Sequence, residues 1–274
     1  MLHKQDFLTS SDGLNLFWQA WEPEGAVHGT VCLVHGLGEH SGRYAHVAAA
    51  FTTAGLSLHA IDLRGHGLSD GPRGHTPSLA QWLDDIELLL KGATPDRPLF
   101  LYGHSLGGIL ILSYGIHRRS QLTGFISTGP VLRISAEVPP LKAMLGKIMA
   151  SLWPTFSQRS GLIAADLSRD QEVVQAYIDD PLVHDWVSSR LFVEMIAAGQ
   201  DTLEKAADFQ LPVLLYHAQI DRLTDRTATE EFYAKIGSTD KTLHIWPNLY
   251  HEVHNEPEKD QVLAEMIEWI ITRC

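Results

Sequence analysis

Cysteine is nearly absent from this chain of 274 residues, which contains only Cys32 and Cys274. Two cysteines cannot form the disulfide framework that holds small secreted domains together, and this pair does not resemble a zinc site. A reducing compartment is consistent with such a composition.

Positive charge and long apolar runs are also scarce. The chain has 21 Lys and Arg against 33 Asp and Glu, a net charge of −12, which argues against nucleic acid as the main partner. Residues 1–13 lack the apolar stretch of a signal peptide, and no window reaches the about 18 apolar residues of a membrane span. We therefore expect a cytoplasmic protein, while the oligomeric state and a peripheral membrane contact stay open.

Two blocks of the sequence alternate short apolar runs with helical patterns, which is typical of βαβ units around a mostly parallel sheet. The apolar run and the helical pattern of each pair occupy residues 30–35 and 44–54, 57–62 and 79–90, 99–103 and 106–117, 213–218 and 228–236, and 242–246 and 261–271. Ahead of them, residues 7–18 predict an antiparallel hairpin that turns at Asp12 and Gly13.

An insertion separates the two blocks. From about residue 131 to about 207 the strand signal disappears, and the apolar residues follow helical spacing interrupted by prolines. The sequence therefore predicts an α/β core formed by residues 1–130 and 208–274, with a helical insertion at 131–207.

A Gly-x-Ser-x-Gly motif, from Gly103 to Gly107, lies between an apolar run and a helical pattern. A nucleophile on a sharp strand-to-helix turn needs small neighbours, because the backbone crowds that turn. The helix that follows adds its N-terminal dipole, which favours an anion. Ser105 is therefore the candidate nucleophile, and a turn without chemistry is the alternative.

A serine nucleophile needs a histidine base and a carboxylate that orients it, and on this kind of sheet their chain order is Ser, acid, His. Asp221 directly follows the apolar run 213–220, and His251 follows the last run through a short loop. These two residues are the candidate acid and base.

Each assignment has a rival. Asp225 stands where a helix would begin, which is typical of a capping residue rather than a catalytic acid. His254 could replace His251 as the base, but a structural role in the loop is the simpler interpretation. His251 and His254 are also one residue too close for the H-E-x-x-H zinc motif, so we expect no metal site.

Two backbone N–H groups are candidates for stabilising the oxyanion of an acyl-transfer reaction. One belongs to Leu106, directly after the nucleophile. The other belongs to Leu37, in the His-Gly-Leu-Gly loop that follows an early strand. The alternative is that these glycines only end the strand.

Several separated strings together resemble the α/β-hydrolase superfamily and, within it, the monoacylglycerol lipase and lysophospholipase group of serine hydrolases. The similar strings are residues 35–44 (HGLGEHSGRY), 62–69 (DLRGHGLS), 103–108 (GHSLGG), 221–225 (DRLTD) and 250–254 (YHEVH). The resemblance spans residues 30–274 and is loose only in the insertion. It implies an α/β-hydrolase fold, with a mostly parallel central sheet flanked by helices and a helical cap inserted between the two halves of the sheet.

The resemblance implies a Ser105, Asp221 and His251 triad, an oxyanion hole at Leu37 and Leu106, and no cofactor. The expected function is hydrolysis of monoacylglycerols or related single-chain lipid esters through an acyl-enzyme. A lysophospholipase, a short-chain carboxylesterase and a peptidase are alternatives with the same triad, and a ligand-binding protein without catalysis is an alternative of another class. Dehalogenase or epoxide hydrolase chemistry would need a carboxylate where Ser105 stands.

The first helical pattern of the insertion carries an apolar face. Its members are Leu141, Met144, Leu145, Ile148, Met149, Leu152 and Trp153. We expect this face to pack on the core. The alternatives are the wall of an acyl-binding tunnel, with Leu141, Met144, Leu145 and Ile148 as candidate substrate-binding residues, or a face that rests on a micelle or membrane.

Four residues of the strings that resemble the family are expected to support the site rather than to react. His66 and His104 stand beside glycines and are expected to brace loops through hydrogen bonds. Tyr44 is expected to pack at a helix start, and Arg43 to be solvated or paired.

Overall fold

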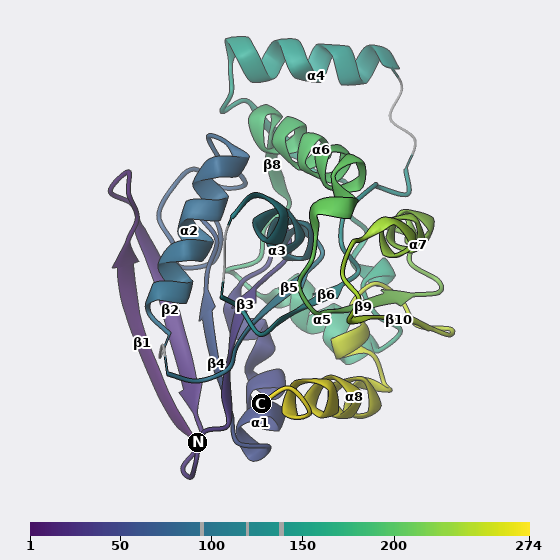
Figure 1. Cartoon of the computed structure of the whole chain (residues 1–274). Coiled ribbons are helices and arrows are strands. Elements are labelled where there is room, and N and C mark those ends of the chain that lie inside the picture. The colour runs from purple at the N-terminus through teal and green to yellow at the C-terminus, as the bar shows by residue number, and fades with distance from the viewer. Residues whose placement is uncertain (94–95, 119–120, 137–139) are drawn as a thin grey trace.

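The central sheet of the computed structural model has eight strands in the order β1-β2-β4-β3-β5-β6-β9-β10 (Figure 1). Their bounds are β1 Leu2–Thr9, β2 Asn15–Glu22, β3 Gly29–Val34, β4 Leu56–Ile61, β5 Leu99–His104, β6 Gly124–Thr128, β9 Val213–Ala218 and β10 Lys241–Trp246. The structure describes residues 1–93, 96–118, 121–136 and 140–274, except for the side chains of 140–143. β1 and β2 form the expected antiparallel hairpin, β2 is antiparallel to β4, and all other pairs are parallel.

Helices cover both faces of this sheet, which confirms the α/β-hydrolase fold. The flanking helices are α1 Ala45–Thr53, α2 Leu79–Lys91, α3 Leu106–His117, α7 Arg226–Lys235 and α8 Lys259–Ile271. α1 and α8 bury Phe51 and Met266 in one apolar cluster, and α2, α3 and α7 contribute Trp82, Ile109 and Phe232 to another. The sheet therefore separates two cores, as the alternation of strands and helices requires.

Strand β6 was not predicted, although the neighbouring strands were. Its sequence, Gly-Phe-Ile-Ser-Thr, is short and ends in two polar residues. Ser127 and Thr128 are nevertheless fully buried, because β6 lies between β5 and β9 in the sheet. Burial by neighbouring strands outweighs the weak β pattern of this segment.

The inserted segment between β6 and β9 contains three longer helices and one small sheet. The elements are α4 Pro140–Leu152, β7 Ser157–Arg159, α5 Gln171–Asp179, β8 Trp186–Ser188 and α6 Ser189–Glu204. Short 3₁₀ helices lie in the insertion at Ala164–Asp166 and Ala206–Asp208, and in the core at Ser41–Tyr44 and Val253–Asn255. The sequence indicated helices here, and it did not predict β7 and β8, which pair antiparallel. Three-residue strands are too short for an alternating pattern to be recognised.

Helix α4 lies at the top of Figure 1, against α6 and away from the sheet. Met144, Leu145 and Ile148 are 52, 51 and 44% exposed, so the expectation that this apolar face packs on the core is wrong. The side chain of Leu141 lies outside the described residues. Periodicity shows which residues share a face of a helix but not what covers that face.

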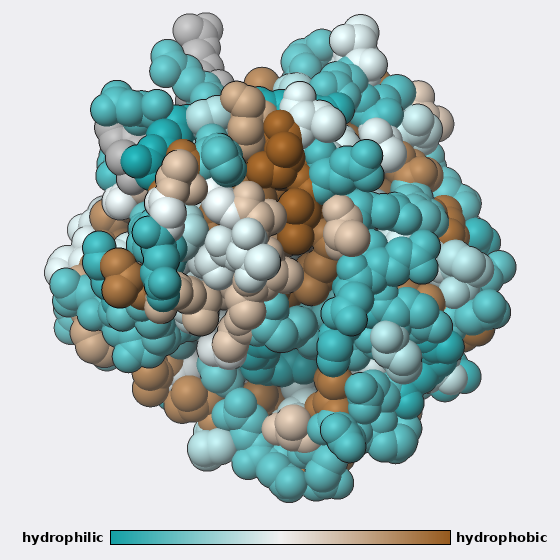
Figure 2. Space-filling view, turned by 90° about the horizontal axis from the view of Figure 1, so that it is seen from below, coloured by the Kyte–Doolittle hydropathy of each residue, from teal (hydrophilic) through white to brown (hydrophobic). Residues whose placement is uncertain are grey.

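The side of the molecule that faces away from α4 has a different surface composition. Figure 2, which views the molecule from below, shows a mostly hydrophilic surface crossed by a narrow hydrophobic strip. None of the helices in the described parts of the chain has the length and apolar character that crossing a membrane requires.

Candidate active site

Ser105 lies on the turn between β5 and α3, and its backbone has φ 53° and ψ −111°. A positive φ is strained for a residue with a side chain, so the surrounding packing must hold it. A Cβ at Gly103 would overlap the carbonyl of Gly107, and a Cβ at Gly107 would overlap the carbonyl of Val34. Both glycines of the motif are thus required by close backbone packing, and this packing holds Ser105 in its strained turn.

His251 and Asp221 form a buried hydrogen-bonded pair in the loops that follow β10 and β9. The Nδ1–H of His251 donates to Oδ2 of Asp221 at 2.7 Å, and the two side chains are 3% and 0% exposed. The backbone N–H groups of Leu223 and Thr224 donate to Oδ1 at 2.8 and 2.9 Å, and the Thr224 hydroxyl donates to Oδ2 at 2.8 Å. The carboxylate is therefore fixed and can hold the imidazole in one tautomer.

The pair lies beside the turn that carries Ser105. The N–H of Ser105 donates to the carbonyl of Thr128 at 2.9 Å. A Cβ on the next residue, Gly129, would stand 3.2 Å from the His251 ring and 3.5 Å from Oδ2 of Asp221. The end of β6 therefore brings the candidate nucleophile, base and acid to one place, although they are far apart in the sequence.

The protonation states of this pair suit a base and its orienting acid. Burial opposes the negative charge on Asp221, but His251 and His217 outweigh it and hold the pKa of this carboxyl well below its usual range. Burial also opposes the positive charge on His251, but the Asp221 carboxylate outweighs it and raises the pKa of the imidazole. Asp221 thus stays ionised and favours the imidazolium that forms when His251 accepts a proton.

We expect kcat/KM for ester hydrolysis to fall at acid pH with an apparent pKa above 6.5, the ordinary value for histidine. His251 can accept a proton only in its neutral form, so activity is present above its pKa and is lost as the pH falls through it. A pH–rate profile measures this directly. A profile that is flat down to pH 5 would contradict the assignment of His251 as the base.

The loop that carries Leu37 is held in a defined orientation by His35, which is fully buried. The Nδ1–H of His35 donates to the carbonyl of Gly36 at 2.7 Å, while Nε2 accepts from the N–H of Leu63 at 2.9 Å. The Gly36 carbonyl and the Leu37 N–H belong to one planar trans peptide and point in opposite directions. Fixing the carbonyl therefore fixes the direction of the Leu37 N–H.

Both candidate oxyanion donors are free to bind a ligand. Within the described parts of the chain, the backbone N–H groups of Leu37 and Leu106 donate to no protein acceptor. The loop also approaches the nucleophile closely, because a Cβ on Gly36 would stand 3.3 Å from Cβ of Ser105. This arrangement can stabilise a negative oxygen next to Ser105.

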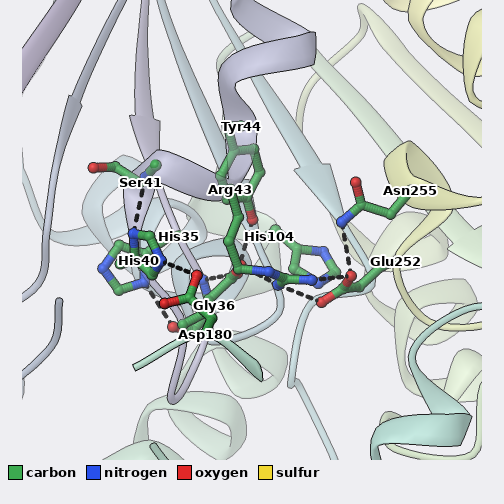
Figure 3. A network of polar contacts seen from close by, with 12 residues as sticks. His35, Gly36, His40, Ser41, Arg43, Tyr44, His104, Asp180, Glu252 and Asn255 are labelled. Carbon is green, nitrogen blue, oxygen red and sulfur yellow. Dashed lines mark hydrogen bonds and ion pairs between the residues drawn. The ribbon is translucent and has the colours of Figure 1, made fainter. Parts of the chain in front are cut away.

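A buried network of charges supports the same loop (Figure 3). Oε1 of Glu39 accepts from the Gly36 N–H at 2.6 Å and from the Tyr44 hydroxyl at 2.8 Å. Arg43 donates to Oε2 of Glu39 at 2.6 Å and binds both oxygens of Glu252 at 2.7 Å. Arg43 is thus paired rather than solvated, and it links the Leu37 loop to the loop that carries His251.

The supporting role of Glu39 and Glu252 was not predicted from the sequence. One signal was available, since Glu39 precedes Arg43 by four residues, a spacing typical of ion pairs on a helix. No sequence pattern pointed to Glu252, which lies 209 residues from Arg43.

The histidines expected to brace loops do so. Nδ1 of His66 lies 3.0 Å from the carbonyl of Arg64, and Nδ1 of His104 lies 3.0 Å from Oγ1 of Thr128. The ring centroid of His104 is 4.7 Å from that of His251, and burial together with His251 lowers the pKa of His104 to about 4. His104 is therefore neutral and adds no positive charge next to the base.

The rival residues occupy structural positions. Oδ1 of Asp225 accepts from the N–H of Thr227 at 2.9 Å and caps α7, as its sequence position indicated. His254 is fully buried and stacks on the ring of Tyr44, with a centroid distance of 4.8 Å, and burial holds its pKa well below the usual range. Neither residue takes part in the contact between His251 and Asp221.

The amino-acid sequence of this chain is similar to those of known proteins. A family model described as Hydrolase_4, serine aminopeptidase, S33, matches residues 25–258. The chain is 35% identical to a monoacylglycerol lipase of Mycolicibacterium smegmatis, and the match covers 95% of this chain and 94% of that protein. It is 40% identical to an uncharacterized abhydrolase domain-containing protein of Dictyostelium discoideum over 97% of this chain, but it spans only 29% of that protein's length.

The fold is similar to solved structures as well. The crystal structure of a Paleococcus ferrophilus monoacylglycerol lipase superposes with a TM-score of 0.88 at 31% identity, covering 94% of this chain and 99% of that one. A soluble variant of the Saccharomyces cerevisiae monoglyceride lipase gives a TM-score of 0.91 at 22% identity over 100% of this chain and 96% of that one, a likeness of fold.

Proposed function

The chain belongs to the Hydrolase_4 family of serine α/β-hydrolases, and from this premise we propose that it cleaves the ester bond of monoacylglycerols or of related single-chain lipids. It is a carboxylic ester hydrolase. The observation that carries the proposal is the strained Ser105 turn beside the buried pair of His251 and Asp221. The similarity to monoacylglycerol lipases supports the choice of substrate.

The proposed reaction uses Ser105, His251 and Asp221 as a triad. The Ser105 hydroxyl oxygen attacks the carbonyl carbon while His251 takes the hydroxyl proton, and the N–H groups of Leu37 and Leu106 bind the oxyanion. The intermediate collapses, the C–O bond to the alcohol breaks, and the alcohol leaves with the proton from His251. Water then attacks the acyl-enzyme in the same way, releasing the fatty acid and restoring Ser105.

We propose that residues 131–207 act as a cap that selects the acyl chain. The cap also has a hollow of about 400 Å³ that is open to its surface and is lined both by apolar residues such as Ile178 and Trp186 and by the charged Arg159 and Asp185. The exposed Met144, Leu145 and Ile148 of α4 are flexible or branched apolar side chains, which suit an acyl chain or a lipid aggregate. The contact between α4 and the substrate is a prediction. The cytoplasmic location of the protein is a prediction as well.

Release of fatty acid from a long-chain monoacylglycerol tests the proposal, with Ser105→Ala as the comparison. We expect rapid release by the natural chain and a loss of about 10⁴-fold or more in kcat for the variant, because the nucleophile is removed. Chromatographic quantification of the fatty acid measures both. Activity that survives in Ser105→Ala would overturn the triad.

A substrate panel separates the alternatives. A chain that cleaves only a short acyl ester is a short-chain carboxylesterase, one that prefers a lysophospholipid is a lysophospholipase, and one that prefers an aminoacyl arylamide is a peptidase. Labelling by a fluorophosphonate probe excludes a purely ligand-binding protein, because the probe reacts only with an activated serine.

A further inference from the structure

The segment 180–188, which runs from α5 to β8 and which we call the docking segment, binds the core next to the candidate oxyanion hole. The backbone N–H of His184 donates to the carbonyl of Gly38 at 2.8 Å, and the N–H of Ser188 donates to the carbonyl of Gly74 at 2.8 Å. Near its start, Oδ2 of Asp180 lies 2.8 Å from Nε2 of His40 (Figure 3). The cap thus contacts the loop on which Leu37 lies.

Two core glycines make this backbone contact possible. Gly38 and Gly74 have φ values of 77° and 62°, which favour glycine. A Cβ on Gly38 would overlap the carbonyl of His184, and a Cβ on Gly74 would overlap the carbonyl of Trp186. At these two points the backbone of the docking segment therefore lies directly against the backbone of the core.

The side chain of His184 holds its own residue in this position. Its Nε2–H donates to the carbonyl of Gly65 at 2.9 Å, and its Nδ1 accepts from the N–H of Trp186 at 3.3 Å. Because the Gly65 carbonyl can only accept, Nε2 carries a proton. Because Nδ1 accepts a hydrogen bond, it carries none, and the imidazole is neutral. Both ring nitrogens are used, and one of them anchors the docking segment to the core.

The loop of Leu37 is consequently held at two carbonyl groups, those of Gly36 and Gly38, from two different parts of the chain. His35, in the core, fixes the carbonyl of Gly36 at 2.7 Å. His184, in the cap, fixes the carbonyl of Gly38 at 2.8 Å. The His35 contact acts on the peptide that carries the Leu37 N–H, whereas the His184 contact acts on the peptide between Gly38 and Glu39 and so holds the far end of the same short loop.

We propose that His184 is a positioning residue for the oxyanion hole, so that the cap contributes to the rate of the chemical step in addition to covering the site. This inference rests on the proposed ester hydrolase function and on the role of Leu37 in it. It predicts that the contact between His184 and Gly65 acts on the transition state more than on substrate binding, because the oxyanion exists only there.

The test compares His184→Asn with His184→Gln in monoacylglycerol hydrolysis. The glutamine amide can place an N–H near the position of Nε2, whereas the shorter asparagine amide cannot reach the carbonyl of Gly65. We expect kcat of His184→Asn to fall by about 10-fold or more with KM changed less than about 2-fold, since losing an oxyanion donor outright costs about 10²–10³. His184→Gln should keep most of the activity.

A trifluoromethyl ketone analogue of the substrate gives a second readout, because Ser105 adds to it and forms an oxyanion. Its inhibition constant should rise in His184→Asn by the same factor by which kcat/KM falls. As a matched control, His244→Asn changes a half-buried histidine on the edge strand β10, paired with Glu265 at 2.9 Å, and should leave both constants unchanged.

Three outcomes decide the matter. Equal kcat for His184→Asn, His184→Gln and the natural chain overturns the proposal, and so does a loss that lies in KM alone, which would indicate a cap that only binds substrate. If His184→Asn does not fold, a His184→Gln kcat as low as that of Ser105→Ala overturns it too. Failure of the proposed function is distinct, since either the natural chain would then release no fatty acid from a monoacylglycerol or Ser105→Ala would release it as well.

Discussion

Asp221→Asn should lower kcat for ester hydrolysis by about four orders of magnitude without unfolding the protein. An amide at this position can donate to Nδ1 and so stabilise the wrong tautomer of His251, and it no longer stabilises the imidazolium. The carboxylate now accepts hydrogen bonds from His251, Leu223 and Thr224 at 2.7 to 2.9 Å, so the exchange disturbs a fully satisfied acceptor. Steady-state kinetics measure the loss of kcat, and thermal unfolding measures the stability of the variant.

Asp225→Asn is the matched control for this variant. Asp225 caps α7 and pairs with Arg133, which is half exposed, so its removal should affect stability by at most about 1 kcal/mol and activity very little. Comparable losses of kcat in both variants would show that the acid had been assigned to the wrong carboxylate.

Arg43→Met should lower the free energy of unfolding by about 3–5 kcal/mol. Arg43 is 10% exposed and neutralises two carboxylates, Glu39 and Glu252, that are 3% and 2% exposed. Burial opposes the charge on Arg43, but Glu252 and Glu39 outweigh it and raise its pKa, which reflects how strongly the three groups interact. Without the guanidinium, two buried carboxylates repel one another and lack their main donor. Urea denaturation measures the loss.

Arg133→Met supplies the comparison. Arg133 also binds two carboxylates, Asp225 and Glu231, but its side chain is 47% exposed, so its loss should cost less than about 1 kcal/mol. In Arg43→Met, activity should fall as well, because Glu39 holds the N–H of Gly36 in the loop that carries the proposed oxyanion donor Leu37. Equal destabilisation by the two variants would mean that the buried network does not support the fold.

The element pattern and the position of the Ser105 turn were predictable because both depend on neighbouring residues. Strands β3, β4, β5, β9 and β10 match the predicted runs within about two residues, since hydrophobic periodicity is a local property. Gly103, Ser105 and Gly107 indicate a tight turn by themselves, because a crowded backbone admits few residue types. Chain order then favoured Asp221 as the acid and His251 as the base, with Asp225 and His254 as the alternatives.

Contacts between distant segments were not predictable in the same way. The network of Glu39, Arg43 and Glu252 joins residues 209 positions apart, and His184 meets Gly65 across 119 positions. Their side chains carry no periodic signal, and the partners become neighbours only through the path of the chain. The burial of the polar end of β6 has the same origin.

By itself, the amino-acid sequence determined that a mostly parallel sheet forms, where the Ser105 turn lies, and which few residues could assist it, because turns and amphipathic elements are set by adjacent residues. Only the tertiary structure decided that Arg43 is buried in an ion network, that the apolar face of α4 stays exposed, and that the docking segment holds the loop of Leu37. These features depend on which segments contact each other in the folded chain, because burial and ion pairing are set by those contacts and not by adjacent residues.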